Sequence, residues 1–407
     1  MKVLVMVLDG FGVGAMADCL PSEAGANTAK SVLSANADLK IPNLLNLGLG
    51  NILNEPSLAQ PSKSAIFGKA KLKHYGADSF AGHQEIMGTK PAKPTEQPFF
   101  KVIDKVYAGL VAAGIKVEKI YAKDLIGSSN ARLAFLKIAD KAIFADNMES
   151  MPGSVYNLTC SLDLMSFAEI KELAGILRKM VEIPRIIAFG GENVSMQNIL
   201  NAAFESGDYF GINAPKSGVY KQNYQVIHLG YGIDHTTQLP YFLHKEGIPV
   251  IFTGKVADIV YNEDGVNIPG VDTREILEYT LQQWKSIDRG FICANIQETD
   301  LAGHSENAVL FGEKLEIVDS YLAKFIDSMG AGDMLIIMAD HGNDPKVSNQ
   351  HTREYVPLLI KVGAAESRLI NIGTRETMSD VAKTVMEYFG LQGNLAGESF
   401  LPLIMSS

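Results

Sequence analysis

The amino-acid sequence predicts an α/β protein whose central sheet is mostly parallel, and two observations support this class. Short apolar runs flanked by Gly or Asp are typical of strands that are covered on both faces. They occur at residues 3–8, 248–252, 290–296 and 334–339. Between them lie amphipathic helical patterns, such as 273–284 and 313–329, with apolar residues at three- and four-residue spacing. Strands that alternate with helices form a parallel sheet flanked by helices.

Turn-rich segments mark the edges of a second, inserted domain. Three prolines fall within eight residues of the segment 88–98, and the segment 212–223 is again rich in turn-forming residues. The chain between them has its own helical patterns and an apolar run, at 99–114, 166–180 and 185–190. We therefore expect a core domain of residues 1–95 and 225–407 and an inserted, smaller α/β cap domain of residues 96–224.

The composition excludes several classes of partner. The 407 residues are 47% hydrophobic and 20% charged, and the formal net charge is −10, so we expect no nucleic-acid partner. The first apolar run ends at Asp9, and no stretch approaches the roughly twenty apolar residues of a membrane span. The cysteines, Cys19, Cys160 and Cys293, lack C-x-x-C spacing, which is typical of a reducing compartment. We expect a cytoplasmic protein that binds a small molecule and needs no obligate protein partner.

Three aspartates lie where strands are expected to end. Asp9 ends the first apolar run, Asp300 follows the third, and Asp340 ends the fourth. The carboxyl ends of parallel strands share one edge of a sheet, and ligands bind there. A single aspartate of this kind is better explained as a solvated loop or helix cap. The three together predict a shared crevice.

Three of the eight histidines accompany these aspartates. His304 lies four residues after Asp300, His341 directly follows Asp340, and His351 lies ten residues further along. A lone histidine is usually a hydrogen-bonded core residue, but this pairing with strand-end carboxylates is hard to attribute to chance. The six residues form two acid-and-imidazole sets, enough for two divalent ions. Mixed carboxylate and imidazole ligands suit Mn²⁺, Zn²⁺ or Fe²⁺ better than Ca²⁺ or Mg²⁺.

Ser79 is a candidate nucleophile. Asp78 is expected to cap a helix that begins near Ser79, where free N–H groups and the helix dipole stabilise a phosphate. A metal ion beside the hydroxyl would lower its pKa and activate it. The alternative is an ordinary serine at a helix start.

The glycines at 10–15, "GFGVGA", loosely match a dinucleotide-binding loop. Their spacing is G-x-G-x-G, and Asp9 directly before them would repel a pyrophosphate. We therefore reject the nucleotide-binding interpretation.

Seven segments agree in order, spacing and chemistry with one known family. They are "LDGFGVG", "GANT", "IPNLLNLGLGNI", "GHQEIMG", "GKVADI", "ADHGND" and "HTREYVPLL". With them the chain resembles the phosphopentomutase family of the alkaline phosphatase superfamily, over most of residues 1–95 and 229–407. The resemblance implies an alkaline-phosphatase-like core with an inserted cap domain and two Mn²⁺ ions.

The resemblance also implies roles for individual residues. Asp9, Asp340 and His341 would hold one ion, and Asp300, His304 and His351 the other. Ser79 stands where the family has its phosphorylated threonine. It would give its phosphoryl group to a sugar monophosphate and regain one from the resulting bisphosphate, which also serves as activator. The net reaction moves phosphate between C1 and C5 of ribose or deoxyribose. Expected substrate contacts are Lys255, Arg353 and Ser154.

The departures from the family lie near the nucleophile and in the cap. Ala77 and Asp78 stand where the family has a lysine, and the segments 188–195 and 218–226 lack the family's arginines. The run 151–155 lacks the family's acid. A lone lysine replaces an arginine fork poorly at a phosphate site.

Four functions therefore stay open: a pentose-phosphate mutase, a mutase for another phosphorylated metabolite, a two-metal phosphohydrolase, and a non-catalytic binding protein. A cap favours a mutase, because excluding water protects a phosphoenzyme.

Overall fold

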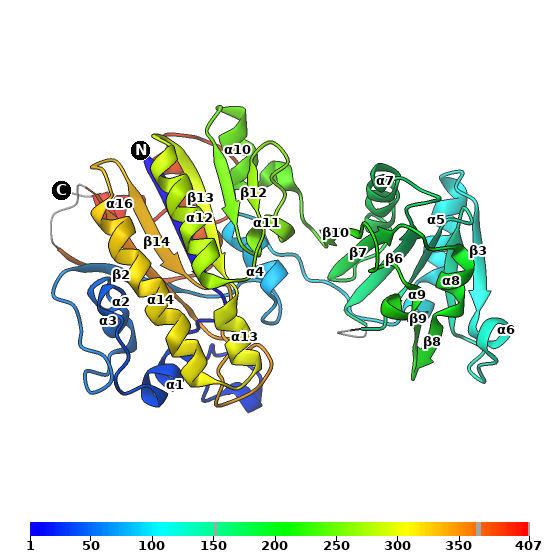
Figure 1. Cartoon of the computed structure of the whole chain (residues 1–407), viewed down its shortest axis with the longest axis horizontal. Coiled ribbons are helices and arrows are strands. Elements are labelled where there is room, and N and C mark those ends of the chain that lie inside the picture. The colour runs from blue at the N-terminus through cyan, green and yellow to red at the C-terminus, as the bar shows by residue number, and fades with distance from the viewer. Residues whose placement is uncertain (150–152, 364–367, 406–407) are drawn as a thin grey trace. The chain divides into compact units, whose positions relative to one another are not determined.

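A twisted sheet forms the centre of the first of two compact units, Met1–Pro91 with Asp234–Ser407 (Figure 1). The computed structural model describes residues 1–149, 153–363 and 368–405. Within them, this sheet has eight strands. In spatial order they are β12 (Val266–Ile268), β11 (Val250–Thr253), β13 (Gly290–Ile296), β1 (Lys2–Leu8), β14 (Met334–Met338), β15 (Val356–Val362), β2 (Ala65–Ala70) and β16 (Leu369–Arg375).

The pairing confirms the predicted α/β class with a mostly parallel sheet. The strands β12, β11, β13, β1 and β14 pair in parallel, β15 is antiparallel to both of its neighbours, and β16 is parallel to β2. Leu8 at the end of β1 pairs with Ile296 at the end of β13, and Val7 pairs with Met338 at the end of β14. The residues that follow β1, β13 and β14 therefore leave the sheet side by side.

Helices cover this sheet and complete its core. Two long helices, α12 (Thr273–Ser286) and α14 (Ala308–Asp327), lie together across one face (Figure 1), with Trp284 packed edge-on against Phe325 at 6.3 Å. The helices α4 (Ser79–Ile86), α10 (Leu239–Lys245) and α15 (Ser379–Tyr388) pack in a second group. The remaining α-helices among the described residues of the unit are α1 (Thr28–Ala35), α2 (Pro42–Asn46), α3 (Leu49–Leu53), α11 (Val256–Ile259), α13 (Glu298–His304) and α16 (Leu401–Met405).

Burial explains why the apolar runs are continuous. Every residue from Val3 to Leu8 is completely buried, because helices cover both faces of β1. Full burial of one such side chain contributes about 1.5–3 kcal/mol of transfer free energy. The run that appears at the start of the sequence is therefore a central core strand.

The second unit, Ala92–Ile233, has its own sheet with helices on both faces (Figure 1). Its strands follow the spatial order β10 (Gln225–Gly230), β7 (Arg185–Gly191), β6 (Val155–Ser161), β5 (Ala142–Asn147), β4 (Ala134–Ile138) and β3 (Val117–Tyr121), with β9 (Tyr209–Ile212) beside β5 and β8 (Ala203–Ser206) beside β9. Its helices are α5 (Ile103–Ala112), α6 (Ala122–Ile126), α7 (Phe167–Arg178), α8 (Met196–Asn201) and α9 (Ala214–Ser217).

Alternating side chains divide the apolar interior of this unit into two clusters. In β4, Leu136 joins the cluster under α5 and α7, whereas Phe135 joins the cluster under α6, α8 and α9. Phe135 stacks there on Phe210 of β9 at a centroid distance of 4.7 Å. The two clusters give residues 92–233 an apolar interior separate from that of the first unit.

The bounds of this unit differ from the expected 96–224. Residues 225–230 were expected in the core domain, but they form β10, which pairs antiparallel with β7 along its whole length. The segment 212–223 was expected at the domain edge, but it contains α9 and lies inside the unit. At the other end, Thr95 and Gln97 donate backbone hydrogen bonds to Glu182 and Gly153. These long-range pairings add residues to the unit at both ends.

Candidate metal and phosphoryl-transfer site

The carboxyl edge of the first sheet carries two groups of possible metal ligands. One group consists of Asp9, Asp340 and His341, and all three side chains are buried. The other consists of Asp300, His304 and His351. Within each group the ligand atoms lie within 4.8 Å of one another. The structure thus brings together all six expected ligands in the expected sets of three.

Strand ends and the helix α13 position the first two aspartates. Asp9 follows β1 directly, and its backbone carbonyl accepts a 2.7 Å hydrogen bond from the Thr299 hydroxyl. Asp300 lies in the first turn of α13, which places His304 one turn later on the same face. Nε2 of His304 lies 3.3 Å from Oδ2 of Asp300. The four-residue spacing in the sequence is therefore a helical i, i+4 pair.

The imidazoles are oriented for binding through Nε2. Nδ1 of His304 contacts the carbonyl oxygen of Asn349 at 2.8 Å, and Nδ1 of His351 contacts that of Ala77 at 2.7 Å. Nδ1 of His341 contacts the carbonyl of Gly342 at 3.1 Å. A carbonyl only accepts, so Nδ1 carries the hydrogen in each ring and Nε2 is left as the ligand atom.

Two asparagine side chains donate hydrogen bonds to the carboxylates. Asn295 donates from Nδ2 to Oδ2 of Asp9 at 3.0 Å, and Asn343 donates to Oδ1 of Asp300 at 2.8 Å. Sequence reasoning did not find either asparagine. Asn295 lies inside an apolar strand, β13, and a buried polar residue at such a position was the available signal.

Ser79 is the first residue of α4, and Asp78 is the N-cap whose side chain accepts from the backbone N–H of Ala81 at 2.8 Å. The Ser79 hydroxyl donates a 2.6 Å hydrogen bond to Oδ2 of Asp340. Close packing makes this contact possible, because a Cβ on Gly82 would lie 2.8 Å from the Asp340 carbonyl oxygen. The expected nucleophile therefore lies directly beside the first group of ligands.

His83 is a further buried member of the site. Its Nδ1 lies 2.9 Å from the Ser79 carbonyl oxygen and 3.3 Å from Oδ2 of Asp340, and its Nε2 lies 3.0 Å from Asn295. Burial disfavours a charged imidazole, but the carboxylates of Asp340 and Asp9 raise the pKa of His83. Its place four residues after Ser79, on the same helix face, was the signal for it in the sequence.

Charge is concentrated at this edge of the sheet. Burial and the neighbouring Asp340 raise the pKa of Asp9 to about 7. Burial opposes ionisation of Asp340 as well, yet His341 and His83 hold the pKa of Asp340 well below its usual range. Burial lowers the pKa of His341 to about 4, so its imidazole is neutral at pH 7.

In the second group, the Asp300 carboxylate raises the pKa of both histidines. Although burial favours neutral imidazole, the Asp300 carboxylate raises the pKa of His351 to about 9. Hydrogen bonding to the same carboxylate raises the pKa of His304. The two histidines in turn hold the pKa of Asp300 below its usual range, against the effect of burial.

The three expected substrate contacts have different surroundings. Lys255 reaches the site, with Nζ 3.0 Å from Oδ2 of Asp9 and 3.9 Å from Oδ2 of Asp300. Arg353 instead donates to the carbonyl oxygens of Leu72 and His74 and to the Asp18 carboxylate, each at 2.9 Å. Its guanidinium therefore ties down the chain that leads to Ser79.

Ser154 lies in the second unit, where its hydroxyl donates to Glu96 at 2.9 Å. Of the run 151–155, residues 151 and 152 lie outside the described residues.

The donor set fits a divalent metal ion in the first group. Oδ1 of Asp9 and Nε2 of His341 are 3.6 Å apart and buried, and neither has a hydrogen-bond partner among the described residues. An unsatisfied buried polar atom costs about 1–3 kcal/mol. A cation bound by both atoms removes that cost, and carboxylate with imidazole is a donor set for divalent transition metals.

Comparisons with known proteins define the class to which this site belongs. The sequence model of the Metalloenzyme superfamily matches residues 1–393. A phosphopentomutase of Herpetosiphon aurantiacus is 30% identical over 419 residues, which cover 98% of each chain. A phosphopentomutase of Acetivibrio thermocellus is 28% identical, over 99% of this chain and all of the relative.

A solved phosphoglycerate mutase of Leishmania mexicana is similar over 97% of both chains, at 12% identity and a TM-score of 0.48.

The protein is thus a metalloenzyme with a two-group acid–imidazole site. More particularly, the chain belongs to the phosphopentomutase family of the Metalloenzyme superfamily and is a metal-dependent phosphomutase, an isomerase. In the described part of the chain, each helix is too short or too polar to cross a membrane.

Proposed function

We propose that this enzyme moves a phosphoryl group between C1 and C5 of ribose or deoxyribose phosphate through a phosphoserine at Ser79 and a sugar bisphosphate. The observation that carries the proposal is the 2.6 Å hydrogen bond from the Ser79 hydroxyl to Asp340, between a helix start and a group of buried ligands. The pentose substrate is taken from the names of the relatives at 27–30% identity.

The proposed metal ligands are the six residues of the two groups, three for each ion, and the proposed metal is Mn²⁺. Two bound ions would neutralise charge on the attacking and leaving oxygens of a transferring phosphoryl group. The buried atoms of Asp9 and His341 without partners support the first site, and the three converging side chains of Asp300, His304 and His351 support the second.

The protein's own groups have separate tasks in this proposal. The Asp340 carboxylate orients the Ser79 hydroxyl toward the incoming phosphoryl group. Ser79 stands at the N-terminal end of α4, where the Asp78 side chain caps the helix and the helix dipole would stabilise a bound phosphoryl group. Lys255, whose pKa is raised by Asp9, Asp340 and Asp300 despite burial, supplies a fixed positive charge.

Two alternatives remain within the same chemistry. The segments 188–195 and 218–226 lack the arginines expected for a pentose-phosphate clamp, which favours a different phosphorylated metabolite as a second candidate. A phosphohydrolase would use the same ligands and differ only in transfer to water.

A panel of phosphorylated sugars and metabolites, assayed with Mn²⁺ and a primer bisphosphate, separates these functions when isomer and free phosphate are measured separately. We expect ribose 1-phosphate to yield ribose 5-phosphate with little free phosphate. If the enzyme converts another phosphorylated metabolite and not ribose 1-phosphate, that metabolite replaces the pentose phosphate as the substrate. Release of phosphate at the rate of substrate consumption would make the enzyme a hydrolase.

A further inference from the structure

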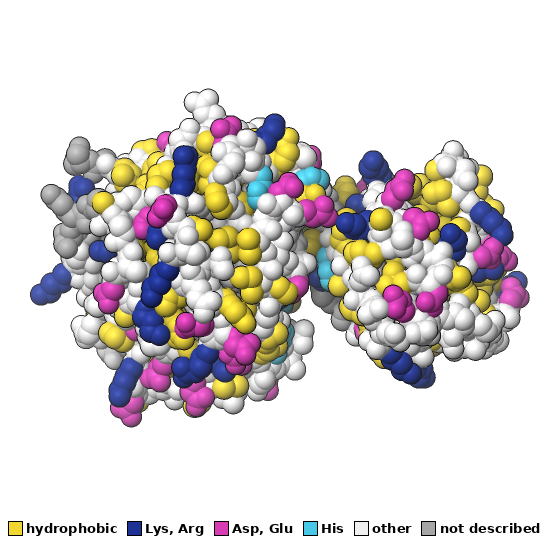
Figure 2. Space-filling view, turned by 45° about the horizontal axis from the view of Figure 1, so that its top comes forward, with side chains coloured by type: hydrophobic (Ala, Val, Ile, Leu, Met, Phe, Trp, Pro, Cys, Tyr) yellow, Lys and Arg dark blue, Asp and Glu magenta, His cyan; other side chains and the backbone are white. Residues whose placement is uncertain are grey.

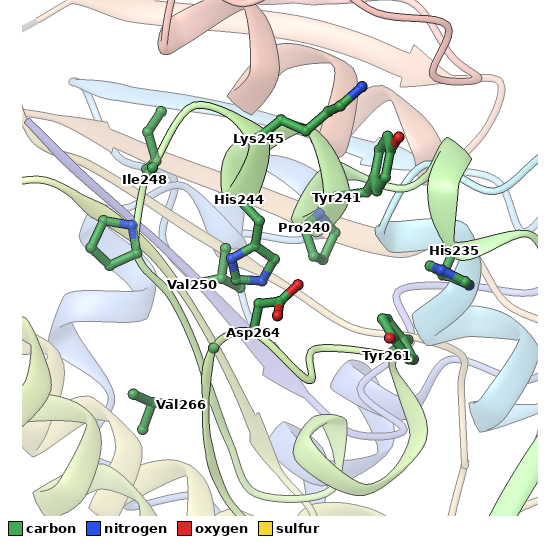
Figure 3. A pocket seen from close by; sticks show the side chains of 13 residues that line it. His235, Pro240, Tyr241, His244, Lys245, Ile248, Val250, Tyr261, Asp264 and Val266 are labelled. Carbon is green, nitrogen blue, oxygen red and sulfur yellow. The ribbon is translucent and has the colours of Figure 1, made fainter.

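A cavity of the first unit, separate from the ligand groups, lies between α10, β11 and the turn before β12 (Figure 3). Its volume is about 700 Å³, which is within the usual range for small-molecule sites of about 300–1,000 Å³. Val250, at the start of β11, lines it. Lys255 of the ligand site lies five residues later, past the other end of that strand. At about 3.3 Å per strand residue, the cavity lies at the amino end of β11 and the ligand site at its carboxyl end.

Three rings surround one end of this cavity, those of His235, Tyr241 and Tyr261 (Figure 3). The rings of His235 and Tyr261 contact each other at a centroid distance of 4.2 Å, with their planes tilted by 32°. Tyr261 is nevertheless 44% exposed. Exposed aromatic faces that line a cavity are suited to stacking against a flat ligand.

Hydrogen-bond acceptors lie across the cavity from the rings. The Asp264 carboxylate lines the cavity and has no hydrogen-bond partner among the described residues. His244 contacts Oδ1 of Asn262 through Nε2 at 2.7 Å, while the amide nitrogen of Asn262 donates to backbone and side-chain oxygens. Nε2 of His244 therefore carries the hydrogen, and Nδ1 is left as an acceptor in the neutral ring.

Lys245 at the rim disfavours a simple organic cation as the ligand. Lys245 lies at the mouth with its ammonium group 4.9 Å from the centre of the Tyr241 ring. A second cation placed between the rings would be repelled by Lys245, which already occupies one aromatic face. A neutral flat ring that donates N–H groups avoids this repulsion and still satisfies Asp264.

We propose that this cavity binds a guanine base, as a nucleoside or nucleotide, with the ring between Tyr241 and Tyr261. Guanine presents N1–H and its 2-amino group side by side, which matches the two oxygens of the Asp264 carboxylate. Adenine offers an amino group flanked by acceptors and lacks this match. The site is separate from the phosphoryl-transfer site and goes beyond the proposed function.

Equilibrium binding of guanosine to the full-length, metal-loaded protein tests the proposal directly. Guanosine is the right probe because it has no phosphate and therefore should not bind to the two groups of metal ligands. We expect saturable binding that is about tenfold tighter than that of adenosine, since a hydrogen bond to a charged group is worth about a factor of ten or more. Asp264→Asn should weaken guanosine binding at least about tenfold, and Tyr261→Ala should weaken both nucleosides.

Asp38→Asn is the matched control, because it removes the same charge from an exposed position away from the cavity. It should leave guanosine binding unchanged. Asp264→Asn should keep the melting temperature and the phosphomutase activity, so loss of binding would not reflect unfolding. Absence of saturable guanosine binding at millimolar concentration, equal affinity for adenosine, or undiminished binding by Asp264→Asn would each overturn the proposal, whatever the substrate of the enzyme is.

Discussion

Nε2 of His304 and Nε2 of His351 lie 3.1 Å apart, and Nδ1 of each ring is bound to a backbone carbonyl. Two neutral rings held in this way would direct two lone pairs at each other, so the pair needs a cation. Asp300 lies 3.3 and 3.4 Å from the same two nitrogen atoms. In the absence of metal, a proton on one ring can lie between the two Nε2 atoms. A divalent ion would bind both nitrogen atoms and the Asp300 carboxylate.

This arrangement predicts the metal content of a variant. His351→Ala should retain the ion of the first group and lose that of the second, because only two of three ligands remain. Elemental analysis should give close to two metal ions per chain for the native protein and close to one for the variant. His235→Ala, which removes an exposed histidine outside both groups, is the control and should keep both ions. A native protein that is active without metal would contradict the two-metal assignment.

The affinity for metal should rise with pH. The pKa of His351 is raised from 6.5 to about 9, so at neutral pH the ring holds a proton that the metal must displace. One displaced proton changes the apparent affinity up to about tenfold per pH unit, so we expect roughly a hundredfold gain from pH 6 to pH 8. Titration with Mn²⁺ at several pH values measures this gain. An affinity independent of pH would show that the histidine binds no metal.

The same shift gives the metal-free protein an opposite pH dependence. Because the folded pKa of His351 lies above its unfolded value, its contribution to stability is fully present below about pH 6.5 and is lost as the pH rises through about 9. Chelator-treated protein should therefore melt at a lower temperature at pH 9 than at pH 6.5, and His351→Ala should reduce this difference.

A variant of Arg353 tests whether this residue holds the chain before Ser79 in place or contacts the substrate. Its guanidinium donates to carbonyl oxygens of the chain that leads to Ser79. Arg353→Ala leaves these groups without a donor, and we expect a loss of about 2–4 kcal/mol of stability with a lower kcat. Denaturant unfolding and steady-state kinetics measure the two effects, and Arg274→Ala, at an exposed position, is the control. A raised KM with unchanged stability would instead identify a substrate contact.

Gly82 tests the packing of α4 against Asp340. A Cβ at this position would lie 2.8 Å from the Asp340 carbonyl oxygen and 3.1 Å from its Cβ. Gly82→Ala should move the helix, break the hydrogen bond of Ser79 and reduce phosphoryl transfer at least about tenfold.

Gly175 in α7 offers a matched control, because nothing lies within 4 Å of its added Cβ. Gly175→Ala should stabilise the protein by about 0.5–1 kcal/mol through helix propensity and leave activity intact. Full activity of Gly82→Ala would show that the close approach of the helix is unimportant.

The sequence predicted those features that depend on local pattern. Fully buried strands such as β1 and β13 have continuous apolar runs, and Asp9 and Asp340 stand directly after strands, so both fold class and ligand candidates were visible. The strand β15 was missed because Pro357 interrupts its apolar run, and β16 because four of its seven residues are exposed. Such strands depend on their partners more than on their own pattern.

Features that depend on distant partners could not be predicted. The domain boundary differs from the expected one because β10 pairs with β7, and nothing in residues 225–230 alone specifies that neighbour. Asn343 lies 43 residues from the aspartate that it supports. The resemblance of the segment "HTREYVPLL" to the family implied a substrate role for Arg353, whereas its partners in the structure are main-chain carbonyls and the Asp18 carboxylate.

The central claim is that Ser79 accepts and returns the phosphoryl group, and phosphopeptide mapping of the protein after incubation with Mn²⁺ and a pentose bisphosphate tests it most directly. We predict one added phosphoryl group, located on Ser79, and its loss when ribose 5-phosphate is added. Ser79→Ala should keep both metal ions and the fold but take up no phosphate, and Ser79→Thr should keep part of the activity. Phosphate on another residue, or full turnover by Ser79→Ala, would contradict the claim.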